Sequence, residues 1–215
     1  MLLIKSMGRY NGDEKVLTDI SFLPKNASML NEGKNINVAG LKGMLCIIPL
    51  LFVMGFVAKN VIDRLPGSLE MNLEFACTFI LMIILLKILS CVHELIHALM
   101  YPSDCEKQIW KFNGGYFVYC NAEISKNRFI VLSVMPMILL GIIPFICWSV
   151  LTNEKTPWSV CALLLSFAMV FIAAGDIYNV INVIKKVPKK ATVVNYGLHT
   201  YYIRKEDVTK AVRDV

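Results

Sequence analysis

Two histidines and a glutamate stand close together near the middle of this 215-residue chain. His93, Glu94 and His97 lie in the stretch SCVHELIHALMY, residues 90–101, and the whole chain holds only three histidines. Side chains four residues apart in a helix lie one turn above each other, so both imidazoles can bind one metal ion. Glu94 would then stand beside that ion as a base. This spacing is the HExxH pattern of zinc hydrolases, and the alternative is a pair of buried histidines that only pack.

A hydrolytic zinc site needs three protein ligands and an open position for water, so a third ligand must come from elsewhere in the chain. The residues after His97 fit no metzincin pattern. Asp176 is the only acid in a later apolar run, where an unpaired carboxylate is costly, and it is the expected third ligand. The adjacent Gly175 would let two helices approach closely. The alternative is a structural ion pair between Asp176 and Lys87.

Three further polar residues have roles that the sequence leaves open. Lys87 could contact Glu94 or the substrate, extend along its helix, or line a water-filled cavity. Asn179 follows Asp176 by about one turn. It could hold that carboxylate, a substrate backbone or a neighbouring helix. His199 lies in a polar C-terminal tail and is expected to be a surface histidine.

Apolar residues make up 56% of the chain and charged residues only 18%, and the apolar residues are gathered in blocks. Blocks of about 20 apolar residues predict membrane-spanning helices. The expected fold is an all-α membrane protein with four transmembrane helices, a small cytoplasmic β-hairpin, and short mixed soluble N- and C-terminal segments. Prolines 136 and 144 predict kinks in the third helix. The expected spans are residues 43–61, 73–100, 129–151 and 158–184.

The polar segments complete the expected organisation. Residues 1–42 form a cytoplasmic N-terminal segment, residues 43–184 the transmembrane domain, and residues 185–215 a cytoplasmic tail. The N-terminal segment could hold a short strand or an interfacial helix around residues 16–23, where the periodicity is weak.

Two polar stretches carry β-prone residues on either side of a turn. Within residues 103–128, two such runs flank Asn113, Gly114 and Gly115, which predicts a hairpin at the membrane surface. The tail is expected to form a strand, a turn at residues 195–197, a second strand and a short helix.

The distribution of Lys and Arg predicts the orientation. Six lie before residue 43, four within residues 101–128 and eight after residue 184, against two in the first connection and one in the third. Basic loops stay in the cytoplasm, so both termini and the hairpin are expected inside, and the metal ligands near the inner leaflet. Trp148 and Trp158 would then lie at the outer interface. The net charge of +6 favours anionic lipid headgroups over nucleic acid as the partner.

These residues predict a membrane-embedded zinc metalloprotease. Glu94 would take a proton from a zinc-bound water and return it to the leaving amine of a membrane-associated protein or peptide substrate. An extended substrate could add as a strand to the hairpin edge. The alternative is a non-catalytic metal-binding membrane protein, either a degenerate protease adaptor or a metal-handling permease. The presence of Glu94 argues against it, because simple zinc binding has no use for that carboxylate. The oligomeric state is not determined by the sequence.

The HELIH motif at the end of an apolar helix, the surface hairpin, the proline-bearing third helix and the Gly175–Asp176 pair resemble the small bacterial "putative zincin peptidase" membrane family. More distantly, they resemble the site-2 proteases, which cut membrane-anchored substrates within the bilayer. The resemblance covers roughly residues 70–190. It implies a multi-pass protein of the bacterial cytoplasmic membrane in which His93, His97 and Asp176 bind zinc and Glu94 is the catalytic acid and base. Site-2 proteases usually have Gly after the Asp, whereas here Gly precedes it, and no PDZ-like domain is present.

Overall fold

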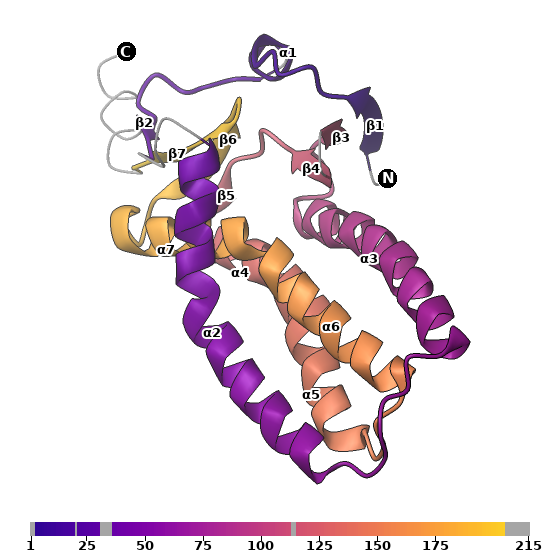
Figure 1. Ribbon diagram of the computed structural model, residues 1–215. Helices are drawn as coiled ribbons and strands as arrows, with labels where there is room; N and C mark the ends of the chain where they lie inside the picture. Colours follow the sequence, from indigo (N-terminus) through magenta and orange to yellow (C-terminus); the bar gives the residue numbers. More distant parts are fainter. Residues whose placement is uncertain (1–2, 20, 31–35, 113–114, 205–215) are drawn as a thin grey trace.

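The computed structural model describes residues 3–19, 21–30, 36–112 and 115–204, apart from the side chains of residues 36–40. A bundle of helices carries two small sheets at one end (Figure 1). The helices are α1 (Lys15–Thr18), α2 (Ile36–Arg64), α3 (Leu73–Met100), α4 (Lys126–Met137), α5 (Ile143–Leu151), α6 (Pro157–Ile172) and α7 (Ala174–Lys186). The strands are β1 (Ile4–Arg9), β2 (Ser28–Met29), β3 (Lys107–Phe112), β4 (Gly115–Tyr119), β5 (Ile124–Ser125), β6 (Thr192–Tyr196) and β7 (His199–Ile203).

Three helical segments are long and apolar enough to cross a membrane, and they cover Leu41–Arg64, Leu73–Met100 and Lys126–Leu151. The bent pair α6 and α7 passes the same test jointly, which raises the number to four among the described residues. α3 has the bounds expected for the second apolar helix, whereas α2 extends beyond the expected residues 43–61 at both ends. The prediction of several long apolar helices is therefore confirmed.

The third apolar segment is one helical path with a wider turn in its middle. A π-helical turn, Ile138–Ile142, joins α4 to α5 and lies between Pro136 and Pro144. Pro144 has no N–H to donate to the preceding turn, and its ring crowds the carbonyl there. A π-helical turn absorbs this mismatch without ending the helix. Gly141 lies in this turn, and a methyl group on it would come within 2.7 Å of Val170 Cγ2 on α6.

The fourth expected helix, residues 158–184, is not continuous, and this prediction is wrong. α6 ends at Ile172, α7 begins at Ala174, and the two helices are bent by 42°. Ala173 has φ −75° and ψ 5°, outside the α-helical range. No proline lies at the break, so the sequence does not indicate the bend, and the packing around it must be considered.

That packing comes from α2, which approaches the break closely. A methyl group on Gly43 would lie 2.5 Å from the carbonyl oxygen of Ala174 and 3.2 Å from the backbone nitrogen of Gly175. By contrast, a methyl group on Gly175 would meet no atom within 4 Å. The close approach expected at Gly175 is therefore made by Gly43 on the neighbouring helix, because the backbone of α7 rather than its glycine is the contact surface.

The single small hairpin that was expected is part of a larger arrangement. β3 and β4 pair in antiparallel register with residues 113–114 between them, but β1 adds to β3 in parallel and makes a three-stranded sheet in the order β1-β3-β4. A second sheet has the order β2-β7-β6-β5 and contains the expected tail hairpin. The turn of that hairpin is at Gly197–Leu198, slightly later than expected. β1 pairs with β3, β2 with β7 and β5 with β6 across long stretches of chain, from Ile124↔Val193 to Ser28↔Tyr202, and local patterns could not predict these pairings. The short helix expected after β7 lies outside the described residues.

The short helix α1, Lys15–Thr18, overlaps the start of the 16–23 region, where a short strand or an interfacial helix was expected. Leu17 of this helix is fully buried against Trp110 and Tyr119 of the first sheet. This burial anchors the N-terminal segment to β3 and β4.

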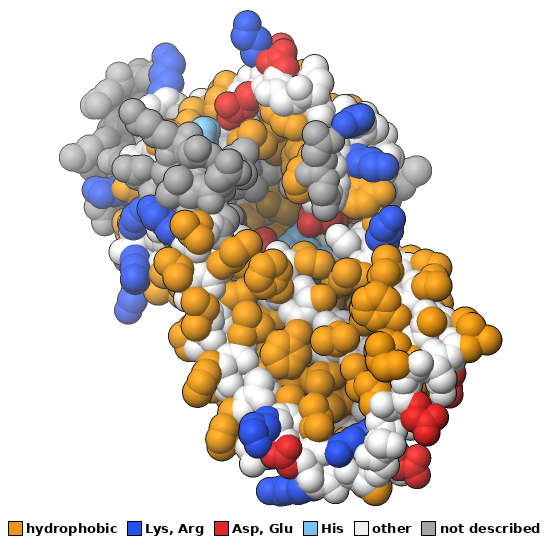
Figure 2. Space-filling model, in the orientation of Figure 1, with side chains coloured by type: hydrophobic (Ala, Val, Ile, Leu, Met, Phe, Trp, Pro, Cys, Tyr) orange, Lys and Arg blue, Asp and Glu red, His pale blue; other side chains and the backbone are white. Residues whose placement is uncertain are grey.

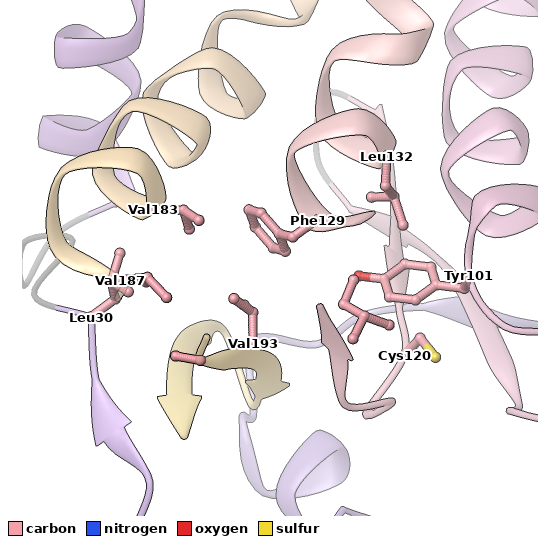
Figure 3. Packing of buried hydrophobic residues seen from close by; sticks show 10 residues of the cluster. Leu30, Tyr101, Cys120, Phe129, Leu132, Val183, Val187 and Val193 are labelled. Carbon is pink, nitrogen blue, oxygen red and sulfur yellow. The ribbon is translucent and has the colours of Figure 1, made fainter. Parts of the chain in front are cut away.

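One hydrophobic core joins the helices to the second sheet. Figure 3 shows Val183 of α7, Val187 directly after it, Phe129 of α4 and Val193 of β6 around a shared interior. Tyr101, the residue after α3, closes this core. The sheets are therefore packed against the helix ends and do not hang free.

The two tryptophans expected at an interface differ in their surroundings. Trp158 is 54% exposed, but Trp148 is buried and its indole N–H donates to Ser159 Oγ at 3.0 Å. The interfacial role expected of Trp148 is wrong, because its ring packs between α5 and α6 beside Phe145.

We predict that Gly43→Ala destabilises the protein by about 1–3 kcal/mol, because the new methyl overpacks the contact with Ala174. Gly55→Ala on the same helix is the control, since a methyl group on Gly55 would meet no neighbouring heavy atom within 4 Å. It should leave stability unchanged or raise it by up to about 1 kcal/mol. Thermal unfolding of the purified variants in detergent measures both effects. Equal behaviour of the two variants would contradict the close contact.

Candidate metal centre

The last turns of α3 place both histidines of the HExxH motif inside the molecule. His93 and His97 are 2% and 7% exposed, and they point from α3 toward α4 and α7. The end of this helix is held in place because Arg128 Nε of α4 donates to the carbonyl of Met100 at 3.0 Å. The helical spacing that the sequence predicts is therefore present and is fixed by packing.

Asp176 joins the two histidines from the first turn of α7. Its Oδ2 lies 3.1 Å from His93 Nε2 and 3.4 Å from His97 Nε2, and the two Nε2 atoms are 3.1 Å apart. Four ligands placed tetrahedrally at zinc bond lengths of about 2.0–2.1 Å are separated by roughly 3.3 Å. The three observed distances are close to this ligand-to-ligand separation. Among the described residues, this is the group that offers three ligand atoms to one ion.

The tautomer of His97 follows from its second nitrogen. Nδ1 lies 3.0 Å from the carbonyl oxygen of Leu132 on α4. A carbonyl can only accept, so Nδ1 carries the proton and the neutral ring presents a lone pair at Nε2. Zinc-binding histidines are usually oriented by such a bond from the opposite nitrogen.

His93 lacks the equivalent support. Its Nδ1 is buried and has no hydrogen-bond partner in the part of the chain that the structure describes. Its Nε2 faces the Asp176 carboxylate and the lone pair of His97. Three acceptor atoms that face one another within 3.4 Å repel unless a cation or proton lies between them. This donor set fits a metal ion.

The helix break explains how a carboxylate is accommodated here. Asp176 lies in the first turn of α7, and helix N-termini stabilise negative charge through their free N–H groups. A continuous helix would offer no such groups at this depth. The alternative ion pair with Lys87 is wrong, because Asp176 pairs with the histidines while Lys87 is exposed and faces a different cavity, beside Lys111 and Tyr116.

A cavity of about 200 Å³ opens onto the metal centre. Figure 2 shows histidine and acidic atoms in a hollow between the apolar helices and the sheets. Glu94 faces this cavity beside His97 and Asp176, and its carboxylate accepts a hydrogen bond from the backbone N–H of Val118 on β4. The other lining residues are Tyr101, Phe117, Phe129, Leu132, Ser133, Asn179, Asn195 and Thr200.

Several of these groups carry no signal in the sequence. Val118 and Leu132 act through backbone atoms, which any residue possesses. Asn195 and Thr200 come from the tail hairpin, about 100 residues beyond the motif, and only the fold brings them to the site. Asn195 Nδ2 donates to the hydroxyl of Tyr101 at 3.0 Å. Burial raises the pKa of that hydroxyl, so Tyr101 stays protonated beside the cavity.

The remaining predicted polar residues fall at different places. Asn179 lines the metal cavity, as expected for a residue one turn after Asp176. His199 is partly buried and lines a neighbouring cavity, so the expectation of a plain surface histidine is only partly right. It lies outside the group of metal-binding atoms.

An HExxH helix and a distant aspartate that converge beneath a small sheet are the arrangement expected of a zincin-type metalloprotein. Residues 86–192 match the family described as "Putative zincin peptidase", and through this region the chain belongs to that family. The predicted family is thus confirmed, and zinc is the metal that it implies, compatible with His93, His97 and Asp176. The likeness to site-2 proteases stays a prediction. No curated protein and no solved structure matches the chain.

We predict that the purified protein binds one zinc ion and that His93→Ala or Asp176→Ala weakens zinc affinity more than about 100-fold. Loss of an outer-shell partner alone costs about 10- to 100-fold, and a ligand contributes more. Asp63→Ala, at the far end of α2, is the control and should keep full zinc content. Metal analysis after dialysis against a weak chelator measures all three variants. If the Asp176→Ala variant keeps its full zinc content, Asp176 is not a zinc ligand.

Proposed function

We propose that this protein is a membrane-embedded zinc metalloprotease that hydrolyses peptide bonds of membrane-associated proteins near the cytoplasmic leaflet. The observation that carries the proposal is the convergence of His93, His97 and Asp176 beside Glu94 in an open cavity. Membership of a zincin peptidase family supports the reaction class.

The exposed apolar surface supports the membrane location. A broad apolar area covers the helical part of the molecule, and charged side chains gather at its two ends (Figure 2). Large apolar side chains on the outer faces of α2, α3 and α5 are 50% exposed or more, and among them are Phe52, Phe56, Ile80, Ile84 and Val150. Contact of so much apolar surface with water is unfavourable, whereas lipid chains accept it.

The arrangement of the ends supports the orientation. Both sheets lie at one end of the bundle, and the α2–α3 and α5–α6 connections lie at the other (Figure 1). The sheet end carries the Lys-rich segments, which favour the cytoplasm. The metal centre lies toward this end, where water and an unfolded peptide can reach it.

The residues of the site suit peptide hydrolysis. Zinc supplies Lewis acidity, which activates a water molecule and polarises the peptide carbonyl. Glu94 faces the same cavity, so its carboxylate can take a proton from the attacking water and pass it to the leaving amine. The Leu132 carbonyl holds the His97 ring in one tautomer and keeps Nε2 directed at the centre. The Tyr101 hydroxyl and the Asn179 amide add hydrogen-bonding groups for the substrate backbone.

An extended substrate would bind along β4. Among the described strands, β4 pairs only with β3, so its other edge, which lies near the end of α3, has no strand partner. The N–H of Val118 on this edge already contacts Glu94, so the edge borders the site. A peptide added antiparallel or parallel to β4 would gain main-chain hydrogen bonds and bring its carbonyl near the metal.

We predict that Glu94→Gln keeps its zinc but loses cleavage by about 10²- to 10⁴-fold, because the general base is removed while the metal ligands remain. The assay uses zinc-loaded protein in detergent and a peptide mixture of known sequence, with products identified by mass spectrometry. Glu74→Gln, in the first turn of the same helix, is the matched control and should cleave normally. Cleavage by Glu94→Gln at the control rate contradicts the proposed mechanism. A wild-type protein that binds zinc but cleaves nothing favours an adaptor or a permease.

We also predict the membrane topology. Alkaline phosphatase inserted after Gly67 or Asn153 should be active, since both positions lie in connections expected outside the cell. Green fluorescent protein fused after Lys190 should fluoresce, since this position is expected inside. The reverse pattern would overturn the orientation.

A further inference from the structure

We propose that a second cavity, next to the metal centre, selects substrates with a bulky apolar side chain beside the scissile bond. The inference rests on the proposed function and names the substrate class for the same site. The cavity measures about 370 Å³. It is lined by Tyr10, Phe112, Phe117, Val118, Tyr119, Asn179, Asn195, Gly197, Leu198, His199 and Thr200.

The two cavities adjoin each other. Five residues line both of them, namely Phe117, Val118, Asn179, Asn195 and Thr200. Two of the five come from β4, the strand whose open edge borders the site. Side chains of a bound strand alternate between its two faces, so a peptide along β4 would direct one side chain into the neighbouring space. The second cavity is therefore within reach of a residue beside the cleaved bond.

The lining indicates which side chain fits. Four aromatic rings and Leu198 form much of the wall, and no Asp, Glu, Lys or Arg is among the lining residues. A charged substrate side chain would lose hydration without gaining an Asp, Glu, Lys or Arg partner among these lining residues. A volume of about 370 Å³ accepts a large side chain, whereas an alanine would leave most of the space unfilled. The pocket therefore favours Phe, Leu, Met or Trp.

The wall is held rigidly by contacts between distant parts of the chain. Glu14, before α1, accepts a hydrogen bond from the N–H of Leu198 at 2.8 Å. Gly197 has a φ of +59°, and a side chain there would collide with the Glu14 carboxylate. Tyr10 packs edge-on against Phe117, with ring centroids 5.4 Å apart. The N-terminal segment thus fixes the β6–β7 turn and one aromatic wall together.

The metal-binding residues come from the family region alone, whereas the wall of the second cavity does not. His93, His97 and Asp176 lie within residues 86–192, which define the family. Tyr10, Asn195 and residues 197–200 lie outside that range but line the second cavity. The family region therefore holds the metal-binding residues and part of the pocket wall, and the flanking segments of this chain complete that wall.

The test uses zinc-loaded protein in detergent and a peptide library of known sequence. Wild-type cleavage sites should be enriched at one position beside the cut by about 10-fold or more for Phe, Leu, Met or Trp over Ala, because apolar pockets discriminate over this range. Leu198→Trp fills the cavity and should shift the preference toward small side chains. Leu198→Ala enlarges it and should increase the share of Trp. Leu69→Trp is the control, since Leu69 is 37% exposed, close to the 39% of Leu198, but lies in the α2–α3 connection.

The outcomes separate this inference from the proposed function. One contrary result is cleavage that depends on Glu94 but shows no size preference, and another is a preference that neither Leu198 variant changes. Either result contradicts the role of the pocket but leaves the proposed protease function in place. Absence of cleavage by the wild type overturns both. A shift in preference with Leu198→Ala alone supports the pocket if Leu198→Trp fails to fold, which thermal unfolding and zinc content reveal.

Discussion

The structure depends on how one carboxylate is held inside an apolar bundle. Asp176 contacts both His93 and His97, and it lies in the first turn of α7, where a helix N-terminus favours negative charge. An isolated charge in this setting would be costly, so the three side chains and a cation stabilise one another. The break at Ala173 is what turns an apolar segment into a helix N-terminus at the required depth.

Packing between helices keeps that break in place. Gly43 lets α2 lie against the backbone of Ala174, and the Leu132 carbonyl of α4 orients His97. α3 therefore contributes the two histidines, α4 the carbonyl that orients His97, and α7 the aspartate. α2 packs against the start of α7. The sheets line the cavity on the side away from the helices, and β4 brings Val118 to Glu94. A site built from rigid elements in this way keeps its ligands within a few tenths of an ångström of the required separation.

The position of the centre reconciles two opposing needs of the proposed reaction. In the proposed location, apolar helices would hold the protein in lipid, whereas hydrolysis needs water and an extended peptide. A site at the junction of helices and sheets meets both, because the cavity opens on the sheet side while the histidines stay buried. Segments outside the family region then shape the space around the site without altering the ligands.

The sequence alone determined what depends on short spacing. The helical repeat places His93, Glu94 and His97 on one helix, and a lone acid in an apolar run indicates Asp176. The residue types at positions 113–115, between two β-prone runs, indicate the β3–β4 hairpin. Only the tertiary structure decided the break at Ala173 and the parallel pairing of β1 with β3. Backbone contacts such as those of Val118 and Leu132 were also beyond prediction. Backbone groups are the same in every residue, and strands about 100 positions apart pair only after the chain has folded.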